Sequence, residues 1–233
     1  AVIAADGTIT RPAAATAVGV RYTVKRTADG TTVQTRTMQL TVTGSGAITP
    51  ATPVTPSAQI TPATPTSGLT FLDVADGDWF RDSVYAAAEA GLMNGVGDQI
   101  FDPNGDTTRG MIMTILYRLA GSPDKTGQGA WYDDARAWAM KTGVSDGTNV
   151  MQKITREQLA AMLWRYAGKP AADLTKLDGF ADGAKVSAYA KEAVAWAIET
   201  GILTGRPGKL LDPQGFATRA ETAAMFVRFS KLK

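Results

Sequence analysis

The chain has 233 residues, 24 Lys plus Arg against 22 Asp plus Glu, and neither Cys nor His. Without Cys there is no disulfide framework or thiolate nucleophile, and without His there is no Ser-His-Asp or Cys-His catalysis. A net charge of +2 does not indicate nucleic-acid binding, and no apolar run approaches the roughly 20 residues that span a bilayer. No signal peptide is recognisable, so we expect an upstream region to have been removed.

Residues 1–46 carry the pattern of a β-hairpin. Apolar and polar side chains alternate over residues 19–25 and 37–42, and Asp29-Gly30 between them suits a turn. Because about 46 residues would make only a thin core, we interpret the segment as the end of a β-sandwich. The stretch 7–12, followed by these strands, resembles the closing half of the immunoglobulin-like modules of bacterial surface proteins.

Residues 47–69 read as a spacer. Five of the 11 prolines fall between residues 47 and 68, separated mostly by Thr and Ala. Proline blocks helices and removes a backbone donor, so this composition predicts an extended, semi-rigid linker.

The remainder of the chain repeats itself three times. The dipeptide Thr-Arg recurs, followed nine residues later by a second Arg, and each unit contains a Gly-x-x-x-Gly loop with an aromatic residue twelve positions before it. The Thr-Arg arginines are Arg109, Arg156 and Arg219; the second arginines are Arg118, Arg165 and Arg228; the loops are 91–95, 143–147 and 201–205; the aromatics are Trp79, Trp131 and Tyr189. Repeats one and three share Asp-Pro seven residues before the first arginine, whereas repeat two has Asn149 there and reads as having lost this loop.

Each repeat is predicted to be helix, Gly-bounded loop, helix. The first helix starts near the aromatic and ends at a Gly suited to the left-handed conformation. The second starts at Thr, with capping-box partners three residues after Thr155 and Thr218 but only Met111 after Thr108. Because one helix pair cannot bury its apolar stripe, we expect three pairs to pack about a common axis.

These motifs resemble the S-layer homology family of cell-wall anchoring repeats. The resemblance rests on residues 71–74 with Trp79, the Gly-x-x-x-Gly loops, Phe101-Asp102-Pro103 and the Thr-Arg starts. Of the family's Thr-Arg-Ala-Glu motif, residues 218–221 match in full. The resemblance implies a mainly α, three-pronged spindle with repeats at 70–122, 123–169 (shortened) and 170–233.

The resemblance also implies a function and a location. It implies non-covalent binding to secondary cell-wall polysaccharide, often pyruvylated, in grooves between the prongs of an extracellular protein at the bacterial surface. It implies no cofactor, no catalytic activity of its own, no nucleic-acid partner and no membrane insertion, and it leaves the oligomeric state open.

The three Thr-Arg arginines are the main candidates for ligand contact. Each follows a helix N-cap, where a cation is unfavourable by roughly 0.3–1 kcal/mol, and the free N–H groups there favour an anion. A guanidinium holds a carboxylate in a bidentate fork, so an acidic sugar would suit each place. The alternative is a salt bridge within the chain, from Arg109 to Asp102 or from Arg219 to Asp212.

Aromatic and loop residues complete the predicted carbohydrate site. An aromatic plane covers the C–H face of a sugar, which suggests ligand contact by Trp79, Trp131 and Tyr189, with core packing as the alternative. Asp78 is a further candidate. Gly95, Gly147 and Gly205 would let backbone amides approach a ligand, although turn geometry explains them equally well.

Four rival functions remain at this stage. A calcium loop starting at Asp102 lacks Gly at its sixth position and has Met113 where a bidentate Glu is needed. A glycosidase would need paired carboxylates, and the acidic residues 73, 76, 78, 133 and 134 lie in loops without a catalytic frame. A helical protein-binding module and a fragment of a carbohydrate-active enzyme with its catalytic domain upstream are the further alternatives.

Overall fold

The computed structural model describes residues 2–3, 9–10, 17–25, 32–41 and 68–232. The chain divides into two compact units, Ala1–Pro53 and Val54–Lys233. The predicted linker over residues 47–69, except for its last two residues, and the turn at Asp29-Gly30 lie outside the described residues.

The described residues of the first unit form two antiparallel strand pairs. Strand β1 (Val2–Ile3) pairs with β2 (Ile9–Thr10). Strand β3 (Ala17–Lys25) pairs with β4 (Thr32–Thr41), and the register shifts between Val24 and Lys25. The longer pair agrees with the predicted hairpin, because its alternating residues lie in both strands. The relation to immunoglobulin-like modules stays a prediction.

The second unit is helical, as the repeat pattern predicts. Its helices are α1 (Arg81–Glu89), α2 (Arg109–Leu119), α3 (Asp133–Lys141), α4 (Arg156–Tyr166), α5 (Lys191–Glu199) and α6 (Arg219–Ser230). Three 3₁₀ turns, Leu174–Gly179, Gly183–Lys185 and Ala188–Ala190, precede α5. In the described part of the chain, no helix has the length and hydropathy needed to cross a bilayer.

The second helix of every repeat starts at the predicted Thr. The side chains of Thr155 and Thr218 accept hydrogen bonds from the N–H groups of Gln158 and Glu221. In return, the N–H groups of the two Thr residues donate to the side-chain oxygens of Gln158 and Glu221. Both capping boxes are therefore confirmed. At Thr108 the return bond goes to the sulfur of Met111 at 3.5 Å, a weak acceptor that fits the expected weaker start.

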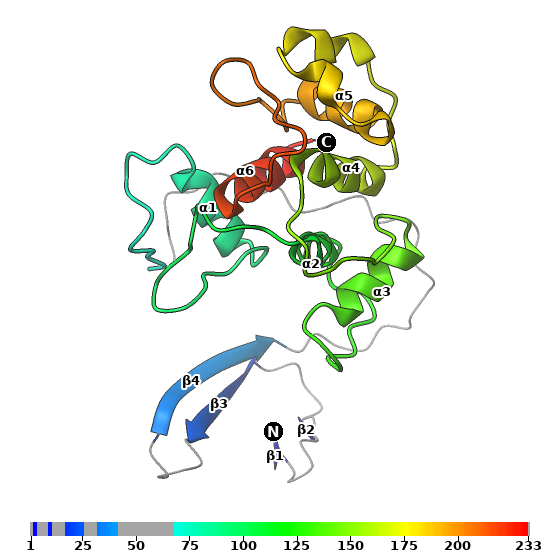
Figure 1. The fold of residues 1–233 in the computed structure, drawn as a ribbon. Coiled ribbons are helices and arrows are strands. Elements are labelled where there is room, and N and C mark those ends of the chain that lie inside the picture. The colour runs from blue at the N-terminus through cyan, green and yellow to red at the C-terminus, as the bar shows by residue number, and fades with distance from the viewer. Residues whose placement is uncertain (1, 4–8, 11–16, 26–31, 42–67, 233) are drawn as a thin grey trace. The chain divides into compact units, whose positions relative to one another are not determined.

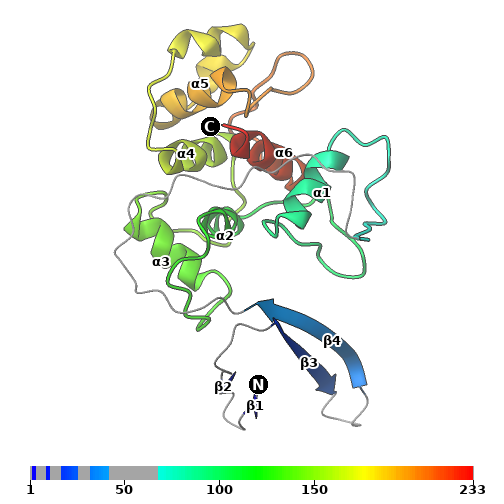
Figure 2. The same cartoon turned by 180° about the vertical axis from the view of Figure 1, so that it is seen from behind.

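The helices that pack in pairs come from different repeats. The second helices α2, α4 and α6 meet at the centre, and α1, α3 and α5 lie outside them (Figures 1 and 2). The packed pairs are α2 with α3, α4 with α5, and α6 with α1. Each prong thus combines the second helix of one repeat with the first helix of the next, and the last helix of the chain closes the circle on the first.

A ring of three hydrogen bonds marks the pseudo-threefold axis. The N–H of Thr107 donates to the carbonyl of Ala217 at 3.2 Å, that of Ala217 to Ile154 at 3.0 Å, and that of Ile154 to Thr107 at 2.8 Å. All three residues are fully buried. Each repeat therefore contributes one N–H donor and one carbonyl acceptor, and the three hydrogen bonds form a closed ring.

The helix N-termini extend this exchange. The first two N–H groups of each central helix donate to carbonyls of the following repeat at 2.8–3.0 Å. The donors on α2 bond to Gln152 and Val150, those on α4 to Gly215 and Pro213, and those on α6 to Gly105 and Pro103. These bonds satisfy backbone N–H groups that have no partner within the helix itself.

The left-handed turn before the second helix is present in all three repeats. Asn149 has φ +52°, close to the +60° of Asp102 and the +48° of Asp212. The turn itself is therefore not lost in repeat two, because Asn tolerates the left-handed conformation without the Asp-Pro pair. The shortening lies before it: the left-handed residue follows the second Gly of the loop by two positions in repeat two and by seven in repeats one and three.

The core follows the central helices in layers of equivalent positions. Leu116, Leu163 and Phe226 occupy the same position of α2, α4 and α6, and all three are fully buried. We predict that Phe226→Ala lowers the free energy of unfolding by about 3–5 kcal/mol, because a large cavity opens at the centre. Phe216→Ala, at a half-exposed position, is the matched control and should cost less than about 1 kcal/mol. Chemical denaturation measures both, and equal losses would contradict this description of the core.

Candidate functional site

The three Thr-Arg arginines link neighbouring repeats. The Nε of each donates to the carbonyl just before the left-handed residue of the next repeat: Arg109 to Thr148 at 3.0 Å, Arg156 to Leu211 at 2.8 Å and Arg219 to Phe101 at 2.8 Å. The bonds of Arg219 span the whole helical unit, since its partners lie in the first repeat. The arginines therefore have a structural role that the sequence did not reveal.

Arg219 is buried without a carboxylate partner. Its Nη2 donates to the carbonyl of Asn94 at 2.6 Å, and its guanidinium lies 4.7 Å from the centre of the Phe101 ring. Burial lowers the pKa of Arg219, while the charges of Asp102 and Asp73 act in the opposite direction. Among the described residues, no carboxylate forms an ion pair with Arg219.

Arg156 belongs to a network of charges. Its Nη1 lies 2.9 Å from Glu221 Oε1, and Arg206 donates to both Glu221 oxygens and to Asp212. The side chain of Arg156 is only 4% exposed, and burial lowers its pKa despite the nearby Glu221. Burial works to raise the pKa of Glu221, but the bond from Arg206 and the charge of Arg156 hold that pKa below its ordinary value.

Arg109 is paired with a carboxylate from the loop of repeat two. Its Nη2 donates to Asp146 Oδ1 at 2.7 Å and to Ser145 Oγ at 3.3 Å. A backbone bond from Thr148 and the charge of Arg109 lower the pKa of Asp146 against a smaller effect of burial.

These contacts correct two expectations about the arginines. The N–H groups beside them are not free, because they bond to carbonyls of the next repeat. The salt bridges Arg109–Asp102 and Arg219–Asp212 are absent among the described ion pairs, and Asp212 pairs with Arg206 instead. A helix start that is already satisfied supplies no anion site by itself, so any anion binding must come from the guanidinium groups.

The three predicted aromatic residues are exposed. Trp79, Trp131 and Tyr189 have 65%, 55% and 53% of their surface in solvent, which argues against core packing for all three. The other tryptophans of the helices differ: Trp196 is buried in the core, and Trp138 and Trp164 pack against it partly buried. Exposed Trp faces are available for a sugar.

One aromatic borders a cavity of about 210 Å³, which we call the Arg219 groove. It combines the loop and second helix of repeat one with Trp131 of repeat two and Arg219 of repeat three. Its lining residues are Leu92, Met93, Asn94, Thr107, Met111, Thr114, Ile115, Arg118, Trp131 and Arg219. Two guanidinium groups face this space, and none of its lining residues is acidic.

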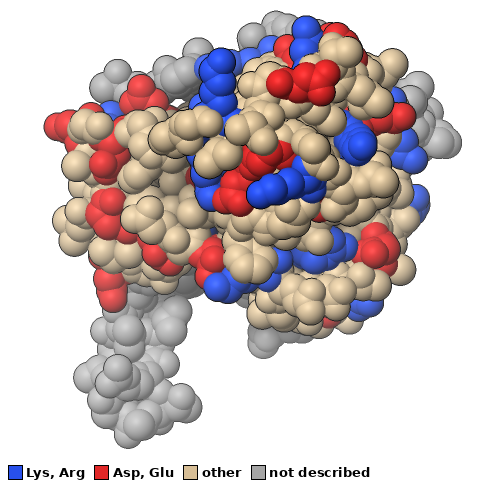
Figure 3. All heavy atoms as spheres, turned by 45° about the horizontal axis from the view of Figure 1, so that its top comes forward, with Lys and Arg blue, Asp and Glu red and all other residues tan. Residues whose placement is uncertain are grey.

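A second cavity, of about 470 Å³, is lined by equivalent residues of the other repeats, and we call it the Arg156 groove. It combines the loop and second helix of repeat three with Trp79 of repeat one and Arg156 of repeat two. Its charged lining residues are Arg156, Arg206, Arg228 and Glu221. Basic and acidic side chains are interspersed over the face in Figure 3, so neither sign covers it alone.

The third equivalent set of residues is Arg109, Arg165, Tyr189 and the loop 143–147. We call this set the Arg109 groove because its members correspond to those that line the two cavities. Here Tyr189 Oη donates to Glu157 Oε1 at 3.2 Å. Burial and the Glu157 carboxylate raise the pKa of Tyr189 to about 12, against the charges of Arg109 and Arg165. The aromatic residue of this set is therefore fixed to the chain's own carboxylate.

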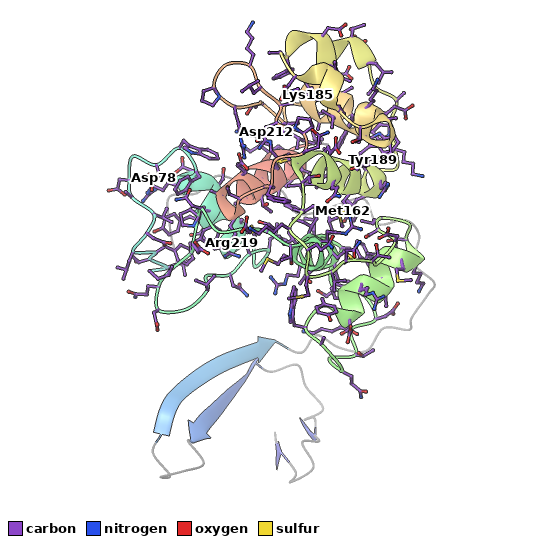
Figure 4. All side chains as sticks on the ribbon, viewed as in Figure 1. Asp78, Met162, Lys185, Tyr189, Asp212 and Arg219 are labelled. Carbon is purple, nitrogen blue, oxygen red and sulfur yellow. The ribbon has the colours of Figure 1, made fainter. Side chains whose placement is uncertain are left out.

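The remaining predicted residues have structural reasons for their identity. A Cβ at Gly95 would lie 2.6 Å from the Ile100 carbonyl, and one at Gly205 would lie 2.6 Å from the Phe180 ring. Gly147 has φ +71°. Asp78 accepts the N–H of Ala75 in the loop before α1, away from Arg219 (Figure 4). Of these four, only Gly205 lines either of the two cavities described above.

Three arginines that line the cavities were not predicted as ligand contacts. Arg118 lines the Arg219 groove and Arg228 lines the Arg156 groove, and their nine-residue spacing from Arg109 and Arg219 was a detectable signal. Arg206 lines the Arg156 groove too, but repeat one has Val96 at its position and the shorter loop of repeat two has no equivalent, so no repeat pattern pointed to it. The proposed calcium loop uses its Pro103 and Gly105 carbonyls to accept bonds from α6.

Comparisons with known proteins match the helical unit. The S-layer homology domain model matches residues 70–110 and 179–223. The chain is 32% identical over 175 residues to an amylopullulanase of Thermoanaerobacterium thermosulfurigenes, covering 67% of this chain and 9% of that protein. It is 30% identical over 172 residues to exoglucanase XynX of Acetivibrio thermocellus, covering 67% and 16%. It is 29% identical over 184 residues to the S-layer protein sap of Bacillus anthracis, covering 71% and 22%.

We predict that Arg219→Lys lowers the free energy of unfolding by about 2 kcal/mol, since an ammonium cannot reproduce both carbonyl bonds and the contact with Phe101. Lys191→Arg, at an exposed position of α5, is the reverse exchange and should change stability by less than about 0.5 kcal/mol. Thermal unfolding followed by circular dichroism measures both variants. An unchanged melting temperature for Arg219→Lys would refute the linking role of this side chain.

We also predict a pH-dependent effect of Glu221→Gln. The pKa of Glu221 is lowered in the folded chain, so its charge stabilises the fold above its ordinary pKa of 4.5 and this contribution is lost as the pH falls through the lowered value. At pH 7 the variant should be less stable by about 2 kcal/mol. The difference should shrink at pH 3 in urea denaturation; a constant difference would contradict the assigned charge network.

Proposed function

Because residues 70–110 and 179–223 belong to the S-layer homology domain family, we propose that this chain anchors a protein to the bacterial cell wall by binding an acidic wall polysaccharide. The proteins to which this chain is similar include an S-layer protein and an amylopullulanase. The proposal locates the chain outside the cell, at the bacterial surface.

The Arg219 groove is the observation that supports this function best. Arg118 and Arg219 both line it, and neither has an ion-pair partner among the described residues. Burial lowers the pKa of both groups, as expected for cations that are held away from water without an ion-pair partner. An anion entering the groove would supply the missing charge through charge-assisted hydrogen bonds.

The remaining lining favours a sugar that carries an acidic group with an apolar part. Leu92, Met111 and Ile115 provide apolar surface in the same cavity, and half-exposed Trp131 borders it. A pyruvate ketal carries a carboxylate and a methyl group on one carbon, so it presents both features together. The Trp131 face would cover the C–H surface of the sugar ring.

The relatives named as enzymes favour an anchoring role for the matched segment. This chain spans 9% of the amylopullulanase and 16% of the exoglucanase, so it matches a small part of each. The proposal is that such a segment attaches a protein, including a glycan-degrading one, while any catalytic domain lies elsewhere in that protein.

We predict that Arg118→Gln weakens binding to purified acidic wall polysaccharide at least tenfold, because one of two unpaired cations leaves the groove. Lys191→Gln removes the same charge from an exposed position of α5 and is the matched control. Calorimetry measures both affinities, with thermal unfolding to show that each variant is folded.

The same polymer after hydrolysis of its acidic substituents should bind the parent chain as weakly as the intact polymer binds Arg118→Gln. Equal affinity for Arg118→Gln and the parent would contradict the proposal. Attachment to wall fragments that survives removal of the polysaccharide would favour a protein partner instead.

A further inference from the structure

The three grooves share one plan but differ in charge. Each contains an arginine of one repeat, the second arginine and loop of another, and an exposed aromatic of a third. The Arg219 groove has no acidic lining residue, whereas Glu221 lines the Arg156 groove. In the Arg109 groove, Asp146 pairs with Arg109 and Glu157 accepts from Tyr189.

One loop position determines much of this difference. Asn94, Asp146 and Thr204 are equivalent, each lying just before the second Gly of its loop. At Asn94 only the backbone carbonyl accepts from Arg219, whereas Asp146 brings a carboxylate to 2.7 Å from Arg109. Thr204 contributes a neutral hydroxyl, which accepts from Arg228 at 3.3 Å. The loop of repeat two therefore supplies its own anion.

The residue after each Thr-Arg arginine strengthens this distinction. Gly110, Glu157 and Ala220 are equivalent. A Cβ at Gly110 would lie 2.9 Å from the Val150 carbonyl and 3.4 Å from the Trp131 ring, so this position brings no side chain, and no charge, to the aromatic. Glu157 is buried and accepts from the N–H and hydroxyl of Ser187 as well as from Tyr189. Its carboxylate thus holds the aromatic that would otherwise cover a sugar.

The Arg156 groove is intermediate. Glu221 is shared by Arg156 and Arg206, so an incoming carboxylate would compete with it for both cations. Arg228 lines this groove as well and has no ion-pair partner among the described residues. An anion can therefore bind there, but with less net attraction than beside Arg118 and Arg219.

From these contacts we infer that the grooves bind acidic glycan in a fixed order. The Arg219 groove binds first, the Arg156 groove binds more weakly, and the Arg109 groove is closed to acidic sugars because Asp146 and Glu157 occupy the place of the ligand's charge. This inference rests on the proposed function and assigns Asn94, Asp146, Glu157 and Gly110 as residues that decide which groove is used.

The first test removes the three exposed aromatics one at a time. The probe is the methyl glycoside of a 4,6-O-pyruvylated N-acetylhexosamine, with its methyl ester as the uncharged control, titrated into the full chain by calorimetry. The parent should show one stronger and one weaker site. Trp131→Ala should weaken the stronger site at least tenfold, Trp79→Ala should affect only the weaker site, and Tyr189→Ala should change neither by more than twofold.

The second test opens the closed groove. The double variant Asp146→Asn with Glu157→Gln removes both carboxylates and should add one binding site for the pyruvylated probe. The control, Asp76→Asn with Glu192→Gln, removes two exposed acidic charges outside the grooves and should add none. Thermal unfolding of both double variants confirms that they are folded.

The outcomes separate this inference from the proposed function. A parent chain that binds neither the probe nor intact acidic wall polysaccharide overturns both. A parent that binds the probe but loses its stronger site in Trp79→Ala or Tyr189→Ala, or a groove-opening variant without an added site, overturns the order of the grooves and leaves wall anchoring in place.

Discussion

The helical unit depends on the ring of backbone hydrogen bonds that joins Thr107, Ile154 and Ala217 around its axis. Each repeat donates one N–H and accepts at one carbonyl, and the six bonds at the helix starts extend the same circuit outwards. A buried backbone group without a partner is costly. No repeat can satisfy these groups alone, so the three repeats are expected to fold as one cooperative unit, with α6 packed on α1 to complete it.

The Thr-Arg arginines join neighbouring repeats, and two of them, Arg156 and Arg219, also line cavities. Arg156 and Arg219 are buried and Arg109 is partly buried, each with its Nε bonded to a carbonyl of the next repeat, and burial removes water from the charge. At Arg109 and Arg156 a carboxylate supplies compensation, whereas Arg219 has two carbonyl acceptors and the Phe101 ring but no ion-pair partner among the described residues. One cation is thereby left available for a partner from outside the chain. The structural and binding roles of these arginines therefore both follow from their position between neighbouring repeats.

Much of the fold follows from local sequence signals. Thr155 with Gln158 and Thr218 with Glu221 define two helix starts because a capping box needs only residues three positions apart. Helix pairing could not be predicted in the same way, because the contact of α6 with α1 joins segments more than 100 residues apart in the chain. The sequence of one repeat does not indicate whether its second helix packs against the first helix of the same repeat or against that of the next repeat.

The site was only partly predictable for a similar reason. The Thr-Arg arginines and the exposed aromatics were found from their spacing, but the bonds that satisfy the helix starts come from other repeats. The mutual position of Asp146 and Arg109, and that of Glu157 and Tyr189, likewise depends on how the circle closes. Sequence therefore indicated the residue types of the grooves, while their individual charge balance required the three-dimensional arrangement.

The most direct measurement is a crystal structure of the chain with an acidic wall disaccharide supplied at one equivalent. We expect the ligand carboxylate between the guanidinium groups of Arg118 and Arg219, with a sugar ring against Trp131. A disaccharide bound beside Arg109 and Tyr189, or one that leaves all three arginines without contact, would contradict the claim that an uncompensated cation anchors this chain to the wall.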